Sequence, residues 1–306
     1  MKRALPTVEI TLPLELTLRE ETLLDMHSVL NVCNVILYEL YSLEMAVDSS
    51  EELEATRREV GRVARSLSDP QDAAEAVGNI DSLIESITRA VDSNVARKPG
   101  SESRAEVIES RANLESIFDI LRVRAREITA RSASPYAWVT HEIEELRNNF
   151  LHVFRAIEKN SKGGYRIVYN LAQHEDQDYY VNLQMSSENG KNVTMPAVFQ
   201  DVMRDLIANA RKYTDPGGRI EAALYEGGGE LAFLVEDTGR GIDPEEITSL
   251  VGFGSRGTNV ADRPTRGGGF GLTKAYYVTR KFNGRMWVAS ELGEGTRIEL
   301  RLPLHG

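Results

Sequence analysis

Apolar residues near the start of the chain recur at helical spacing. From Glu20 to about Val47 they step by three and four residues, an a/d pattern that continues for nearly three heptads. A seam of this length predicts a helix that pairs with another helix, within the chain or across a dimer. The positions of the seam are Leu23, Met26, Leu30, Cys33, Leu37 and Leu40.

Breaks in this pattern divide the chain up to residue 132 into further helices. Capping or loop sequences at 49–52, 68–70 and 98–101 separate predicted helices over 51–67, 71–96 and 103–130. Residues 7–18, which include Pro13, predict a short strand or an extended arm. We therefore expect an all-helical domain over residues 1–134, in which residues 49–99 are a helical pair inserted between the first and last helices.

After Pro135 the helical spacing gives way to alternating strands. One more helix is predicted over about 141–160, and others near 196–213 and 271–282. Strands joined mostly by hairpin-length turns, with a few helices, predict an α+β fold with a layered sheet over residues 142–306. The best strand candidates are 165–170, 178–185, 219–226, 231–237, 285–290 and 296–303.

Composition narrows the classes of function. The net charge of −11 argues against a general nucleic-acid binder, because phosphate contacts need clustered Lys and Arg. Cys33 is the single cysteine, so no intramolecular disulfide can form. No apolar run approaches the ~18 residues that span a bilayer, and the first residues lack a signal-peptide pattern. We expect a cytoplasmic protein without a membrane segment.

The predicted helix over 201–214 aligns polar side chains along one face. Asp205, Asn209, Lys212 and Tyr213 fall at i, i+4, i+7 and i+8. A carboxamide oxygen suits Mg²⁺, which prefers hard oxygen ligands, and an ammonium group neutralises phosphate. The face therefore suits a metal-bound polyphosphate, although a solvated polar face has the same pattern.

A glycine-rich turn follows the predicted strand over 231–237. Asp237 ends the strand, where its carboxylate can accept a hydrogen bond from the exocyclic amine of adenine. Gly239 and Gly241 come next and allow the backbone to approach a flat ligand closely. An ordinary hairpin turn has the same pattern.

A second group of glycines precedes the predicted helix over 271–282. Gly267, Gly269 and Gly271 alternate, and successive glycine amides at a helix N-terminus form a cradle for an anion. Near the end of the chain, Gly295 and Thr296 stand before the last predicted strand.

Taken in order, these four segments resemble the N box and the three glycine boxes of the histidine-kinase ATP-binding domain. This domain has the Bergerat (GHKL) fold, which is shared with gyrase-type ATPases. Residues 250–257 stand where the family has its F box, with Phe253 as the matching aromatic residue. The resemblance implies an α/β-sandwich ATP-binding domain after a helical dimerisation and phosphotransfer-like domain.

The resemblance also implies roles for single residues. Asn209 would bind Mg²⁺ and Asp237 would bind adenine, while Asp205 stands at the first N-box position, where relatives commonly carry Glu or Asn. Residues 243–266 would form the ATP lid, whose arginines Arg256, Arg263 and Arg266 either contact phosphates or face solvent. The other implied ATP contacts are Lys212, Tyr213, Gly239, Gly241, Gly267, Gly269, Gly271 and Thr296.

His27 is the expected phosphoacceptor. It flanks the helical seam, half exposed, with Asn31 one turn further on the same side, and this segment resembles the family's H box. Neutral imidazole is a good nucleophile near physiological pH. Ser28 follows His27 where the family often has Glu or Asp as a proton acceptor. The remaining histidines are expected to be structural or surface residues: His141, His152, His174 and His305.

Together these features predict a homodimeric histidine kinase of a two-component system, which uses ATP and Mg²⁺. His27 would pass its phosphoryl group to an aspartate of a response-regulator receiver domain, and Asn31 would orient water for the reverse, phosphatase, activity. Two alternatives stay open. Ser28 and Asp205 are compatible with a nucleotide-binding signalling scaffold without autokinase activity, and the same ATP-binding fold also serves protein-serine kinases and ATPases.

Overall fold

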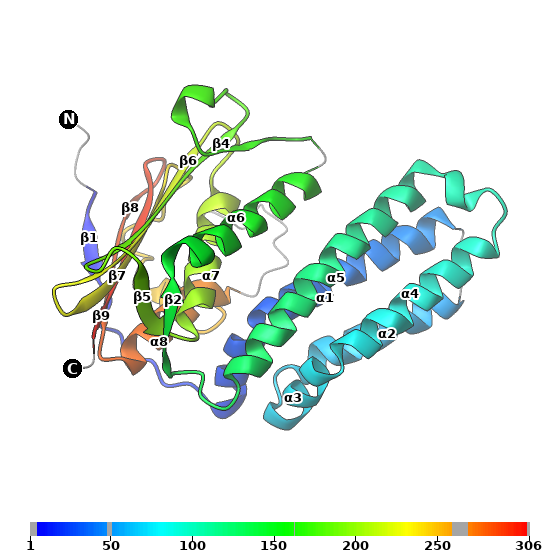
Figure 1. Ribbon diagram of the computed structural model, residues 1–306, viewed down its shortest axis with the longest axis horizontal. Helices are drawn as coiled ribbons and strands as arrows, with labels where there is room; N and C mark the ends of the chain where they lie inside the picture. The colour runs from blue at the N-terminus through cyan, green and yellow to red at the C-terminus, as the bar shows by residue number, and fades with distance from the viewer. Residues whose placement is uncertain (1–4, 48–50, 162, 259–268, 305–306) are drawn as a thin grey trace. The chain divides into compact units, whose positions relative to one another are not determined.

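The structure is a computed structural model that describes residues 5–47, 51–161, 163–258 and 269–304. These residues form two compact units (Figure 1), one of residues 16–133 and the other of residues 5–15 together with 134–304. A helical unit followed by a sheet-based unit confirms the predicted α+β class. Within the described ranges, no helix is both long enough and apolar enough to cross a bilayer.

Two helices of the first unit begin at side-chain caps. α1 (Leu18–Ala46) starts with a capping box, in which the Thr17 amide donates to Glu20 Oε2 at 2.8 Å and the Glu20 amide donates to the Thr17 hydroxyl at 3.4 Å. The side chain of Asp69 caps the helix that begins at Pro70, where it accepts hydrogen bonds from the Gln71 and Asp72 amides. The remaining helices are α2 (Glu51–Ser66), α3 (Pro70–Gly78), α4 (Ile80–Ala96), the short η1 (Ser101–Ser103) and α5 (Ala105–Arg131).

The single helix predicted over 71–96 is two helices, α3 and α4. The backbone turns at Asn79, which has φ −101° and ψ 14° and stands between them. The Asn79 amide donates to the Glu75 and Ala76 carbonyls, which ends α3. Apolar spacing on both sides of the turn resembles one continuous helix, so the sequence pattern concealed the break.

One apolar core joins all five long helices of this unit. α1 and α5 run antiparallel, because Arg104, just before α5, donates to the Ala46 carbonyl at the end of α1. Further along the same pair, the Asn113 amide of α5 donates to Glu39 of α1 at 3.3 Å. The insert belongs to this core as well, since α2 and α4 contribute buried residues that include Leu53, Val60 and Ile87.

The buried stripe of α1 is rotated from the predicted seam. Cys33 and Leu40 lie in both, but Ile36 is fully buried although it was not a seam position. α1 contacts α2 as well as α5. Its buried stripe therefore has to face both helices, and the middle of the stripe points between them. Four seam positions are only half-buried: Leu23, Met26, Leu30 and Leu37. The last three of these pack at the edge of the core.

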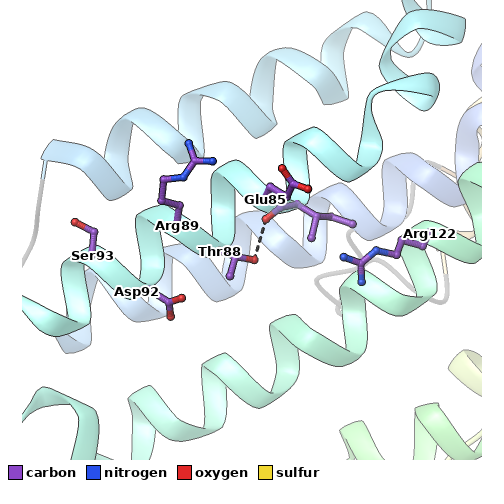
Figure 2. Close-up of a pocket in the computed structure, with 7 residues that line it drawn as sticks. Glu85, Thr88, Arg89, Asp92, Ser93 and Arg122 are labelled. Atoms are coloured by element: carbon purple, nitrogen blue, oxygen red, sulfur yellow. Dashed lines mark hydrogen bonds between the residues drawn. The ribbon is translucent and has the colours of Figure 1, made fainter.

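A cavity of about 690 Å³ lies between α4 and α5 of the helical unit (Figure 2). Two of its charged residues already have partners, since Arg122 pairs with Asp81 at 3.0 Å and Asp92 pairs with Arg111 at 2.6 Å. Acidic and basic groups are balanced in the lining, which gives the cavity no preference for an anion or a cation. The lining residues are Ile84, Glu85, Thr88, Arg89, Asp92, Ser93 and Arg122.

The second unit is built on a seven-stranded sheet with the strand order β1-β8-β9-β7-β6-β4-β3. Three helices, α6 (Ile143–Asn160), α7 (Phe199–Tyr213) and α8 (Phe270–Lys281), cover one face of this sheet (Figure 1). The strands of the sheet are β1 (Thr7–Glu9), β3 (Ile167–Val168), β4 (Tyr179–Ser187), β6 (Arg219–Gly227), β7 (Glu230–Asp237), β8 (Arg285–Glu291) and β9 (Gly295–Pro303).

Two further strands form a small separate sheet that the sequence did not predict. β2 (Trp138–Glu142) pairs antiparallel with β5 (Asn192–Pro196), and the predicted helix over 141–160 therefore begins later, at Ile143. Two short 3-10 turns complete the unit, η2 (Leu171–Gln173) and η3 (Ser249–Val251).

The N-terminal segment does not belong to the helical unit, which corrects the expected boundary at residue 1. β1 pairs antiparallel with β8 and covers the edge of the large sheet. Arg285 of β8 makes a two-pronged ion pair with Glu9, at 2.8 and 2.5 Å. Tyr276 of α8 donates to the Leu12 carbonyl at 2.7 Å. The chain therefore enters the helical unit only at about residue 16.

Candidate functional site

Asp237 stands at the end of β7, directly opposite Thr296 of β9. Its Oδ1 atom accepts a hydrogen bond from the Gly239 amide at 2.8 Å. Burial raises the pKa of this carboxyl to about 6, and backbone hydrogen bonds from Gly239 and Thr296 oppose that rise. A half-buried acid at a strand end is suited to bind a polar edge of a ligand.

The turn after Asp237 has room only for glycine. A Cβ atom on Gly239 would lie 2.4 Å from the Tyr213 carbonyl oxygen, and one on Gly241 would lie 1.9 Å from the Glu291 carbonyl oxygen. Gly241 also has φ +66°, in the left-handed region. The ends of α7 and β8 therefore converge on this turn, whereas the approach of its backbone to a flat ligand stays a prediction.

Ser290 is a buried polar residue of this region that sequence reasoning missed. Its hydroxyl donates to the Gly295 carbonyl at 2.7 Å, lies 3.0 Å from the Thr296 hydroxyl and accepts from the Ile242 amide at 2.8 Å. These contacts fix Thr296 beside Asp237. A serine in an apolar strand gives no signal by itself, because only the register of β8 and β9 brings it opposite Thr296.

The polar face predicted on α7 is present. Buried residues such as Leu206 and Ala210 pack toward the sheet, whereas Asp205 and Asn209 are half-buried on another face. Lys212 lies over the ring of Tyr213, with its Nζ atom 5.1 Å from the ring centroid.

The start of α8 meets α7 at Asn209. A Cβ atom on Gly271 would lie 2.5 Å from Asn209 Nδ2, so the absence of a side chain on Gly271 allows the two helices to touch. Gly269 precedes the helix with φ +76°, and a Cβ atom there would lie 2.5 Å from the Ser255 carbonyl oxygen. The structure thus brings the second glycine motif against the residue predicted to bind metal.

The predicted F-box segment packs on the same helix start. The ring of Phe253 lies 4.9 Å from that of Phe270, and the Thr273 hydroxyl donates to the Gly252 carbonyl at 2.9 Å. Arg256 is exposed. Three predicted residues lie outside the described ranges: Arg263, Arg266 and Gly267.

Asn209 and the first turn of α8 fit Mg²⁺ and a polyphosphate. The Asn209 carboxamide stands beside the N-terminal end of α8, where backbone N–H groups and the helix dipole favour an anion, and its oxygen is a ligand type that Mg²⁺ accepts. The geometry therefore offers a polar strand end at Asp237 for a base and a helix start at Gly269–Gly271 for phosphates.

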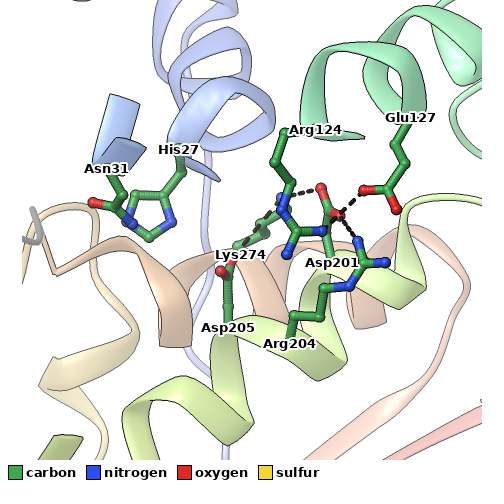
Figure 3. A network of polar contacts seen from close by, with 8 residues as sticks. All are labelled: His27, Asn31, Arg124, Glu127, Asp201, Arg204, Asp205 and Lys274. Atoms are coloured by element: carbon green, nitrogen blue, oxygen red, sulfur yellow. Dashed lines mark hydrogen bonds and ion pairs between the residues drawn. The ribbon is translucent and has the colours of Figure 1, made fainter. Parts of the chain in front are cut away.

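His27 lies on α1 of the helical unit, one turn before Asn31. Asn31 Nδ2 is 3.0 Å from His27 Nε2 (Figure 3). His27 is 6% exposed, which is less than the half exposure expected of a seam flank. When the amide donates to Nε2, the imidazole is neutral and its proton is on Nδ1.

The other histidines serve the sheet unit or its surface. His174 Nε2 lies 3.0 Å from the Asp178 carbonyl oxygen, and His152 is exposed on α6. His141 is in β2, where burial lowers the pKa of its imidazole. His305 lies outside the described ranges.

The segment that carries these motifs matches a known protein family. Residues 194–306 match the family described as histidine kinase-, DNA gyrase B-, and HSP90-like ATPase. The chain is similar to the adaptive-response sensory kinase SasA of Synechococcus elongatus, with 33% identity over 111 residues, which are 36% of this chain and 28% of that protein.

Two further relatives match over a similar stretch. The histidine protein kinase DivJ of Caulobacter vibrioides is 33% identical over 105 residues, 34% of this chain and 17% of that protein. The sensor histidine kinase RppB of Synechocystis is 35% identical over 103 residues, 34% of this chain and 23% of that protein. The match thus spans less than a third of the length of these relatives.

Proposed function

Because residues 194–306 form an ATP-binding domain of the histidine-kinase type, we propose that this chain is an ATP-dependent histidine autokinase of a two-component system. The observation that carries the proposal is the convergence of two glycine turns on α7. One turn stands beside the half-buried acid Asp237, and the other packs on Asn209.

In this proposal the base and the phosphates of ATP occupy opposite ends of the site. Asp237 accepts from the adenine amine, and Thr296, held by Ser290, lines the same end behind the base. Gly239 and Gly241 let the turn pack closely on the ends of α7 and β8, and the backbone of this turn lies on the adenine side of the site.

The phosphates lie toward the start of α8, where backbone amides favour an anion. Asn209 supplies an oxygen to Mg²⁺, and Lys212 neutralises phosphate charge with Tyr213 packed beneath it. Asp205, one turn before Asn209, orients water or metal at the reacting phosphate. The glycines assigned to this end are Gly267, Gly269 and Gly271.

The chemical step assigned to the chain is attack of His27 Nε2 on the γ-phosphorus. A bond forms between nitrogen and phosphorus, the bond to the β–γ bridging oxygen breaks, and ADP leaves. The imidazole then loses its Nδ1 proton, which reaches solvent only once His27 becomes more exposed, because Nδ1 is buried in this conformation. The lone pair on Nε2 points to Asn31 in this conformation, so the Asn31 amide must turn away before attack. In the reverse, phosphatase, activity the same amide orients a water molecule.

The proposal includes partners and a compartment. A receiver domain of a response regulator accepts the phosphoryl group on an aspartate, and a second copy of the chain pairs with the first to form a homodimer. The substrate ATP is supplied in the cytoplasm, which is where we expect the protein to act.

One observation favours a second candidate, a nucleotide-binding scaffold without autokinase activity. Ser28 follows His27 and, unlike a carboxylate, is a poor acceptor for the imidazole proton. Slow self-phosphorylation is therefore compatible with the autokinase proposal, and its complete absence favours the scaffold.

Incubation with γ-labelled ATP and Mg²⁺ tests the chemistry. We expect the full chain to acquire an acid-labile phosphoryl group and His27→Gln to acquire none, because phosphohistidine hydrolyses in acid whereas phosphoserine survives. His152→Gln, a change at an exposed histidine, is the matched control and should label like the wild type. An acid-stable product, or full labelling of His27→Gln, would contradict the proposal.

A further inference from the structure

Lys274 is a fully buried lysine in α8. It is only 1% exposed, although the neighbouring buried positions of the helix are small or aromatic residues such as Ala275 and Tyr276. Removing an ammonium group from water is costly unless charged partners compensate for the lost hydration. The partners of Lys274 therefore indicate what it does.

Two carboxylates of α7 face this ammonium group. Lys274 Nζ lies 3.2 Å from Asp201 Oδ2 and 3.9 Å from Asp205 Oδ2. Figure 3 shows the lysine side chain reaching both acids of α7. Asp201 is 3% exposed, and it also pairs with Arg204 at 3.4 Å. Lys274 thus bridges two acids that stand four residues apart on one helix face.

The ion pair of Lys274 with Asp205 lies next to the contact between Gly271 and Asn209, which forms part of the candidate nucleotide site. Gly271 of α8 touches Asn209 of α7. One turn further along α8 comes Lys274, and one turn earlier on α7 comes Asp205. The two contacts follow each other along a single helix–helix seam, so the same lysine lies one turn from the glycine contact of α8 and within ion-pair distance of the Asp205 carboxylate.

We propose that Lys274 is a positioning residue of the nucleotide site, an inference that rests on the proposed ATP-binding function. Its ammonium group holds the Asp205 carboxylate and clamps the start of α8 on α7. The ammonium group also supplies positive charge beside Asp205 and Asp201, which stand one and two turns before Asn209. Without it, Asp201 keeps its ion pair with Arg204, but the negative charge of Asp205 repels the nucleotide phosphates, and Mg²⁺ is the cation that would offset this charge.

Lys274→Met tests the inference through the dependence of nucleotide binding on Mg²⁺. Calorimetric titration of the full chain with a non-hydrolysable ATP analogue is carried out with EDTA and with saturating Mg²⁺. We expect the variant to lose about ten-fold or more in affinity without Mg²⁺, and clearly less with Mg²⁺, which compensates for the missing ammonium group.

Two controls separate positioning from general loosening of the fold. Val278→Ala removes buried apolar contacts from the same helix and should change affinity by the same factor with and without Mg²⁺. Lys281→Met removes an exposed lysine of α8 and should leave both affinities unchanged. If Lys274→Met does not fold, Asp201→Asn/Lys274→Met replaces it, since that pair removes one positive and one negative charge and still leaves Asp205 without its ammonium partner.

The possible outcomes are distinguishable. Equal losses of affinity in the two conditions, or no loss, for Lys274→Met would overturn the positioning role while leaving the proposed function intact. Failure of the wild-type chain to bind the analogue in either condition would remove the proposed function and this inference together.

Discussion

Asp237 is a half-buried acid at the end of β7. Burial raises its pKa from 3.8 to about 6, so the group titrates within an accessible range of pH. The ionised carboxylate accepts a hydrogen bond from the adenine amine, whereas protonation removes its charge. We therefore expect affinity for a magnesium–ATP analogue to fall as the pH is lowered through about 6, by up to about ten-fold per pH unit.

Calorimetric titrations at about pH 5 and about pH 7.5, with Mg²⁺ present so that the phosphates stay ionised, measure this effect. Asp243→Asn is the control, because Asp243 lies further along the same segment and binds a backbone amide there; its pH dependence should match the wild type. Identical affinity at both pH values would mean that the Asp237 carboxylate does not contact the base.

Single residues differed in how well the sequence revealed them. Asp237 and its glycines were predictable because they are close together and their spacing is distinctive. Lys274 was not, because its partner Asp201 is 73 positions away and a lysine in a helix usually faces solvent. Ser290 likewise became significant only through the pairing of β8 with β9.

α1 illustrates what apolar spacing predicts about an element and what it leaves open. The helix and its core-forming character followed from the pattern, but the direction of its buried stripe did not. The predicted seam and the observed buried stripe both have heptad spacing. Which of them is buried depends on the contact of α1 with α2, and α2 belongs to the inserted segment. The break at Asn79 was missed for a related reason, since α3 and α4 keep a similar apolar spacing across it.

Adjacent substitutions in α1 distinguish the two stripes. Ile36 is fully buried, whereas its neighbour Leu37 is half-buried at the core edge. We expect Ile36→Ala to lower the free energy of unfolding by about 2–5 kcal/mol through the cavity that it leaves. Leu37→Ala should cost about 1–2 kcal/mol. Urea denaturation of the full chain measures both, and a larger loss for Leu37→Ala would favour the stripe predicted from the sequence alone.

At the scale of the whole molecule, the chain passes between its two units twice. It leaves the large sheet after β1, forms the helical unit from about residue 16 to residue 133, and returns to complete the sheet. The sequence predicted two domains in series, because the short segment around Val8 gave no indication of which sheet it would join. Its pairing with β8 depends on a strand near the other end of the chain.

The central claim is that the sheet-based unit is an adenine-nucleotide site with Asp237 as the residue that contacts the base. Calorimetric titration of the full chain with magnesium-bound analogues of ATP and GTP, for the wild type and for Asp237→Asn, tests it most directly. We expect the wild type to bind the adenine analogue at least about ten-fold more tightly than the guanine analogue, since only adenine presents its amine to the carboxylate. Asp237→Asn should fold normally and lose this preference together with most of its affinity. Equal binding of both analogues by the wild type, or unchanged affinity in Asp237→Asn, would contradict the claim.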